Sequence, residues 1–153
     1  YMQGYASLLG EQNLLRTIDG RPNMVFEGEY SAPEDLPSIY SEVHFNWCAD
    51  FSGGDNSQWL LPNRLYEGGY FGIPAIAAAQ HETGRYIQER QIGVAFDPPF
   101  VRQLTELLLR MTPEEYRRMR SRTEDRPLTD FVDTGDIERM TNLAAAQQHS
   151  SGI

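Results

Sequence analysis

Asn63, Arg64 and Glu67 are polar residues that follow Pro62 within one short segment. Proline favours the first turn of a helix, which places Asn63 and Arg64 in that turn and Glu67 one turn further in. A helix N-terminus offers free N–H groups and a partial positive charge, and the Arg64 guanidinium adds a full charge, so this place suits a phosphate ester. The Glu67 carboxylate can accept two hydrogen bonds from a vicinal diol such as that of a ribose.

The segments around these residues alternate between helices and strands. Helices are expected over residues 62–70 and 82–90, and buried strands over 74–78 and 92–96. This alternation favours a parallel sheet with helices on both faces, which is a Rossmann-like α/β fold. Ligands bind such sheets at the carboxyl ends of the strands, and the first turn of the 62–70 helix would lie there.

A further strand is expected over residues 42–50, because apolar and polar residues alternate along it. Its apolar face would be made by Val43, Phe45, Trp47 and Ala49. The polar, glycine-containing residues 52–58 then read as a loop between this strand and the helix that carries Arg64.

The two ends of the chain read mainly as helical. Residues 5–18 fit an amphipathic helix, 23–28 a short strand, and Ser31 with Pro33 the start of another helix. After residue 100, a leucine-rich helix is followed by a helix capped through Thr112-Pro113-Glu114-Glu115, and 136–146 would form a last helix.

Composition limits the partners and the number of domains. The 153 residues are a length typical of one domain, and 22 acidic against 13 basic residues give a net charge of −9. That charge opposes phosphate neutralisation, so nucleic acid is not an expected partner. Cys48 is the single cysteine and cannot form an internal disulfide, which together with the absence of a long apolar run favours a cytoplasmic protein.

The segment from Asn63 to Ala77 resembles family 4 glycosyltransferases, in which a helix carrying a glutamate is followed by Gly-x-Pro, here Gly72-Ile73-Pro74, and an apolar strand. The bacterial exopolysaccharide transferases of the succinoglycan type are the nearest resemblance. The other matching pieces occur in the family's order and are Val25–Gly28, Leu36–Ser41, Thr83–Ile87 and Ile92–Phe96. The resemblance extends roughly over residues 23–110.

This resemblance implies that residues 1–153 form the C-terminal, nucleotide-sugar-binding half of a two-domain GT-B fold. The acceptor domain would lie upstream and outside this chain, so the chain alone would be inactive as a hexosyltransferase. The implied reaction transfers a sugar from a nucleotide-diphosphate donor to a polysaccharide or lipid-linked acceptor. No cofactor or metal is expected, because a helix terminus and arginines would replace a cation at the leaving diphosphate.

The resemblance also implies roles for individual residues. Glu67 would be the second glutamate of a pair eight positions apart and would bind the donor ribose, but Trp59 stands at the first position, which leaves the donor sugar and the retaining mechanism open. Asn63 and Arg64 would face the phosphates, and the loop Gly28-Glu29-Tyr30 would lie against the base. No catalytic residue is assigned.

Plainer interpretations stand beside these roles. Arg64 and Glu67 could form only a surface ion pair worth about 0.2–0.5 kcal/mol, although the resemblance favours the ribose role. His81 is a candidate for contact with the donor sugar, but a helix-capping or surface role is favoured. The arginines of 117–122 could attach the protein to the inner face of a membrane, yet neighbouring acidic residues favour a solvated helix face.

Two other functions remain open at this point. A Rossmann-like module can bind a ligand without catalysing a reaction, and a sugar-nucleotide epimerase shares a similar fold.

Overall fold

A computed structural model describes residues 2–4, 9–49, 58–133 and 135. The chain forms two compact units, Tyr1–Val43 and His44–Ile153, which we call the N-terminal unit and the C-terminal unit. Composition had suggested one domain, and no proline- or glycine-rich linker marks the boundary at residue 43.

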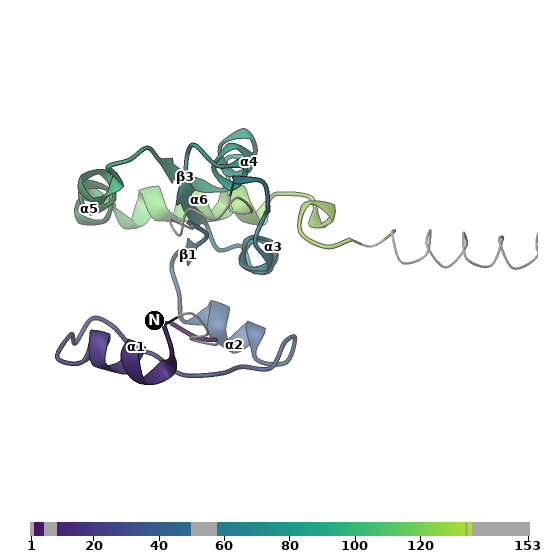
Figure 1. Cartoon of the computed structure of the whole chain (residues 1–153). Coiled ribbons are helices and arrows are strands. Elements are labelled where there is room, and N and C mark those ends of the chain that lie inside the picture. Colours follow the sequence, from purple (N-terminus) through teal and green to yellow (C-terminus); the bar gives the residue numbers. More distant parts are fainter. Residues whose placement is uncertain (1, 5–8, 50–57, 134, 136–153) are drawn as a thin grey trace, which may run out of the picture. The chain divides into compact units, whose positions relative to one another are not determined.

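The N-terminal unit holds the helices α1 (Glu11–Ile18) and α2 (Leu36–Ser41) (Figure 1). The helix predicted over 5–18 is confirmed from Glu11 onward, whereas residues 5–8 lie outside the described part. The strand predicted over 23–28 is wrong as a sheet strand: what forms is one parallel bridge between Met2 and Phe26. Strand pairing depends on a partner distant in sequence, and in the described residues this segment pairs only with the short stretch at Met2.

The predicted helix start at Ser31 is also wrong. Helix α2 begins at Leu36, and the backbone N–H of Ser31 donates to the Asp35 carboxylate at 2.8 Å. Ser31 therefore acts as a donor to a turn that precedes the helix, and its side chain does not cap the helix there.

The C-terminal unit contains a three-stranded parallel sheet in the order β1-β2-β3. The strands are β1 (Asn46–Trp47), β2 (Ala75–Ala78) and β3 (Gly93–Phe96), and helices α3 (Asn63–Tyr70) and α4 (Glu82–Arg90) follow the first two strands. In the register, Asn46 lies beside Ala75, which lies beside Gly93. The α/β Rossmann-like fold expected from the sequence is confirmed, with α3, β2, α4 and β3 close to their predicted bounds.

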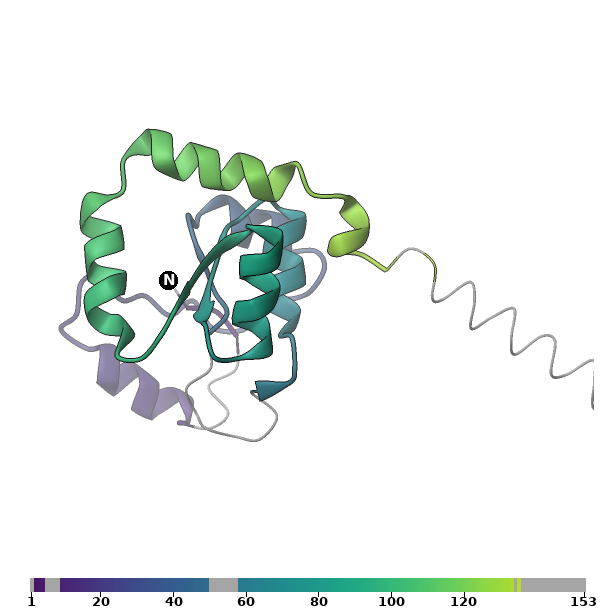
Figure 2. The same ribbon diagram turned by 90° about the horizontal axis from the view of Figure 1, so that it is seen from above.

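Helices lie on both sides of this sheet. Ala75 and Ala77 share a buried cluster with Leu65 of α3 and Ile87 of α4. On the other side lies α5 (Phe100–Arg110), which Figure 2 shows across the strands from α4. Helix α6 (Pro113–Glu124) runs from the α5 side back to α3, which it contacts. The small alanine side chains of β2 let α3 and α4 approach the sheet closely.

The strand predicted over 42–50 is confirmed only as the two residues of β1, and the prediction was wrong about which face is more deeply buried. Trp47 is 41% exposed, and its ring centroid lies 6.1 Å from that of Phe100 on the α5 side. Asn46 and Cys48, expected on a polar face, are 8% and 3% exposed and face α3. The buried side of β1 is therefore the side that meets the helix following it.

Local signals placed the later helices well. The capping box predicted at Thr112 is confirmed, because the Thr112 hydroxyl accepts from Glu115 N–H at 3.2 Å and the Glu115 carboxylate accepts from Thr112 N–H at 2.9 Å. A 3₁₀ turn, η2 (Leu128–Asp130), follows α6. The helix predicted over 136–146 and residues 52–57 of the predicted loop lie outside the described residues.

Candidate functional site

Helix α3 begins at the carboxyl edge of the sheet. Pro62 is its extended N-cap residue, and Asn63 and Arg64 are exposed in the first turn, as the sequence predicts. The N-cap residue Pro62 makes no side-chain capping hydrogen bond. Backbone N–H groups at such an end remain available for an acceptor, and the helix dipole favours a negative one.

Arg64, Glu67 and Cys48 come together where β1 ends. The guanidinium of Arg64 is close enough to Cys48 to act on the thiol through its charge and a hydrogen bond, and the charge of Glu67 also reaches it. Burial is the largest influence and raises the pKa of Cys48 to about 12, while Arg64 opposes that rise. The thiol is therefore neutral and packed beside a positively charged side chain.

Asn46 holds the backbone of the same arginine. Its side-chain amide donates a hydrogen bond to the carbonyl oxygen of Arg64. Gly68, one turn further along α3, makes room for this contact, because a Cβ at that position would overlap the Asn46 amide. Sequence analysis gave Asn46 no role, although the adjacent glycines Gly68 and Gly69 inside a helix signal a close approach of some other group.

Gly69 allows a second group, the Phe131 ring, to approach α3 closely. A Cβ there would overlap the ring of Phe131, which is 8% exposed and covers the helix. Phe131 comes directly after η2, so the segment that follows α6 packs against α3. The helix that carries Arg64 and Glu67 is thus in contact with β1 through Gly68 and with Phe131 through Gly69.

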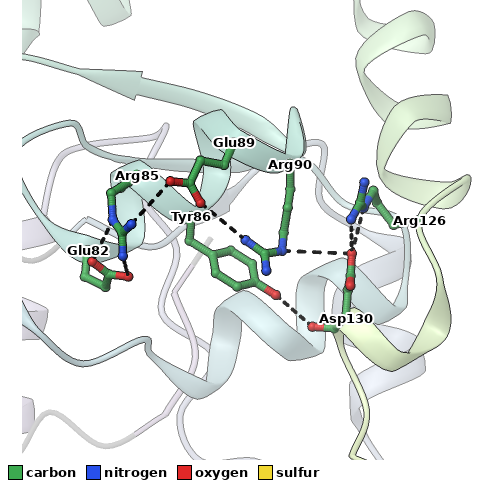
Figure 3. Close-up of polar contacts among 7 residues, drawn as sticks. All are labelled: Glu82, Arg85, Tyr86, Glu89, Arg90, Arg126 and Asp130. Carbon is green, nitrogen blue, oxygen red and sulfur yellow. Dashed lines mark hydrogen bonds and ion pairs between the residues drawn. The ribbon is translucent and has the colours of Figure 1, made fainter.

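Polar contacts hold Asp130, the residue before Phe131, in place (Figure 3). The Asp130 carboxylate accepts from Nε of Arg126 at 2.7 Å and lies 4.0 Å from Nε of Arg90. The hydroxyl of Tyr86 donates to the Asp130 carbonyl oxygen at 2.9 Å, and the Arg90 guanidinium stacks 3.7 Å from the centre of the Tyr86 ring. These contacts join η2 to α4 and hold Phe131 in place over α3.

A neighbouring ion-pair group lies on the exposed side of α4. Nε of Arg85 donates to Glu82 at 3.0 Å, and Nη1 of Arg85 lies 3.3 Å from Glu89. Exposed pairs of this kind contribute little to stability, so we assign them no part in a site.

The remaining predicted site residues lie elsewhere. His81 is the N-cap residue of α4, half-buried at the carboxyl end of β2, and its side chain makes no capping hydrogen bond.

The loop Gly28-Glu29-Tyr30 belongs to the N-terminal unit, where Gly28 has a φ of +80° and its carbonyl oxygen accepts from Gly4 N–H at 2.7 Å. Its grouping with Asn63, Arg64 and Glu67 stays a prediction, because these three residues belong to the other unit. Trp59, at the family's first glutamate position, is 76% exposed.

The described residues also bear on metals and membranes. Among them, no group of three or more His, Cys, Asp or Glu side chains is arranged to hold a metal ion. Within that same part of the chain, every helix falls short of the length and apolarity that a bilayer crossing requires.

The arginines of α6 are partly matched by acidic neighbours: Arg117 pairs with Glu114 at 2.6 Å and Arg120 with Glu124 at 2.8 Å.

Comparison with known proteins shows that this chain is similar to a succinoglycan biosynthesis protein. The relative is ExoL of Rhizobium meliloti (strain 1021), which is 47% identical over 100 residues. The match covers 65% of this chain and 25% of ExoL, so the aligned part spans about a quarter of that protein. No protein-family profile and no solved structure match the chain.

Proposed function

We propose that this chain is the donor-binding part of a glycosyltransferase of exopolysaccharide synthesis, with the GT-B architecture of family 4. The observation that carries the proposal is that Arg64 is exposed in the first turn of α3 and Glu67 follows one turn later, with both charges reaching Cys48 at the end of β1. A positive side chain, free N–H groups and a carboxylate one turn away match the diphosphate and the ribose of a nucleotide-sugar. Rossmann-like folds bind several kinds of ligand. The 47% identity to a succinoglycan biosynthesis protein supports a nucleotide-sugar as the ligand here.

The proposed roles follow the chemistry of each group. Asn63 and Arg64 contact the phosphates, and Glu67 accepts from the ribose hydroxyls. His81 stays a candidate for contact with the donor sugar. Charge on the leaving diphosphate is stabilised by Arg64 and the helix N-terminus, so the reaction needs no metal.

The proposed setting is the cytoplasm, with the acceptor a growing polysaccharide or a lipid-linked glycan. A further domain of the same protein would bind that acceptor. Attachment to the inner face of a membrane would then bring the donor half to a lipid-linked acceptor.

Calorimetric titration with uridine, guanosine and thymidine diphosphates tests this proposal directly. We expect one of the three to bind more tightly than its own nucleoside, because Arg64 and the helix N-terminus contribute only when phosphate is present. A chelator such as EDTA should leave that affinity unchanged. If none of the diphosphates binds more tightly than its nucleoside, the donor-site proposal is wrong.

A further inference from the structure

Asn46 is a buried polar residue in the middle of the site region. It is 8% exposed, and its backbone N–H is already used, because it donates to the Pro74 carbonyl oxygen at 2.9 Å. Burying an amide side chain costs free energy unless the amide finds a partner. The Arg64 carbonyl oxygen in the first turn of α3 is that partner.

The contact requires a close approach of strand and helix. Gly68 provides it, since any Cβ at that position would overlap the Asn46 side chain. The contact between Asn46 and Gly68 therefore sets the distance between α3 and β1. It also sets the position of the first turn of α3 along β1.

Cys48 lies two residues after Asn46 and faces the same side of β1. Asn46 holds the backbone of Arg64, while Cys48 lies beside its guanidinium. The Asn46 amide and the Cys48 thiol thus lie near different ends of the same arginine, its backbone carbonyl and its guanidinium. An apolar side chain at position 46 could fill the same space, but it could not hold the Arg64 carbonyl oxygen in one place.

We propose that Asn46 is a positioning residue for the donor diphosphate, acting through the backbone of Arg64; this inference rests on the proposed function. The amide sets the place of the first turn, so that the guanidinium and the free N–H groups of α3 face the same phosphate. Loss of the amide leaves the fold in place and moves these donors away from the diphosphate.

Asn46→Asp tests the proposal, because the two side chains have nearly the same shape and the ionised carboxylate cannot donate. At pH 8 the variant should bind the preferred nucleoside diphosphate about tenfold more weakly than wild type and bind the nucleoside equally well. At pH 5 a larger fraction of the introduced carboxyl is protonated and can donate again, so the diphosphate affinity of the variant should return to within about threefold of the wild-type affinity. Arg64, Glu67 and Cys48, the titratable groups that the described residues bring together at this end of β1, are common to both proteins, and the ratio of the two affinities removes their effect.

Asn46→Ala is the second variant and should lose the same affinity at both pH values, because it cannot donate at either. Thr123→Val is the matched control: Thr123 is 1% exposed and donates within α6 to the Met119 carbonyl oxygen at 3.3 Å, so the variant loses a buried hydrogen bond away from β1. It should lower the melting temperature and keep wild-type nucleotide affinity. Arg64→Ala serves as the reference for a lost phosphate contact.

The outcomes separate this inference from the proposed function. Weak diphosphate binding by both Asn46 variants, recovering at pH 5 only for Asn46→Asp, supports the inference. If Arg64→Ala weakens diphosphate binding while both Asn46 variants bind like wild type, the inference is wrong and the donor site stands. Equal weakening for diphosphate and nucleoside also overturns the inference, since Asn46 then acts on the fold alone. If wild type binds no nucleotide, the proposed function fails and this inference fails with it.

Discussion

At the scale of single residues, Arg64 is held at two points while its surface remains open. Its carbonyl oxygen accepts from Asn46, its guanidinium lies beside Cys48, and the residue is exposed in the first turn of α3. A residue whose backbone is held in this way needs less ordering of that backbone when it binds a ligand. Such preorganisation is what a phosphate contact of high affinity requires.

Arg64→Ala should weaken nucleoside diphosphate binding by about one to two powers of ten and barely change nucleoside binding. A hydrogen bond to a charged group contributes roughly 1.5–3 kcal/mol, and that contribution exists only with the phosphate present. Titration of both ligands against wild type and variant measures it. Equal losses for the two ligands would remove Arg64 from the phosphate site.

Cys48 predicts an alkaline dependence of stability. Burial raises its pKa from 9.0 to about 12, so above pH 9 the unfolded chain releases a proton that the folded chain keeps. The stabilising contribution is therefore complete below pH 9 and is lost as the pH rises towards 12, at up to about 1.4 kcal/mol per pH unit. Denaturant unfolding of wild type and Cys48→Ala between pH 8 and 11 should show the advantage of wild type shrinking. A constant difference between the two proteins would contradict a buried neutral thiol.

At the scale of elements, sequence reasoning succeeded where the signal is local. Pro62 marked the start of α3, the apolar run 74–78 marked β2, and Thr112 with Glu115 marked the start of α6. It failed where the structure depends on distant partners. Asn46 is buried because Gly68, on a later helix, lets its side chain reach the Arg64 backbone. The alternation of residues along β1 carries no information about how closely α3 packs on the strand.

For the same reason, the sequence predicted only part of the candidate site. The placing of Asn63 and Arg64 in the first turn and Glu67 one turn on follows from helix geometry, and the structure shows it. The contributions of Asn46, Cys48 and Phe131 come from packing between segments that are far apart in the sequence. A pair of glycines within one helix was the only sign that such packing exists.

Gly69→Ala tests the packing of Phe131 on α3. The added Cβ overlaps the ring, so the variant should lose about 1–3 kcal/mol of stability, although alanine is the better helix former. Phe131→Leu also destabilises the protein by itself, but the double variant should be more stable than the sum of the two losses predicts, because the smaller side chain makes room. Thermal unfolding of the four proteins gives the coupling, and Gln88→Ala, on the exposed face of α4, is the control. Additive losses would show that the two residues are not in contact.

At the scale of the whole molecule, the described sheet has only three strands, and the aligned residues correspond to 25% of ExoL. In a two-domain transferase the reacting groups meet between the domains, and positioning there supplies much of the rate. Donor binding and sugar transfer should therefore separate in experiments on this chain.

Residues 1–153 alone should bind a nucleoside diphosphate and fail to release it from any nucleotide-sugar. A coupled assay for diphosphate release, with uridine, guanosine and thymidine diphosphate sugars, measures turnover. A longer protein that contains this chain is the positive control. Turnover by residues 1–153 alone would show that the catalytic groups are all within them.

Helix α3 is proposed to hold a nucleotide-sugar by its diphosphate and its ribose. Glu67→Gln with two ligands tests it most directly: the preferred ribonucleoside diphosphate and its 2′,3′-dideoxy analogue. The variant should bind the ribonucleotide more weakly by about one to two powers of ten, because a charged acceptor of two hydroxyl protons is lost. The dideoxy analogue, which offers the carboxylate nothing to accept, should bind wild type and variant alike. Equal weakening of both ligands, or no weakening of either, would contradict the account.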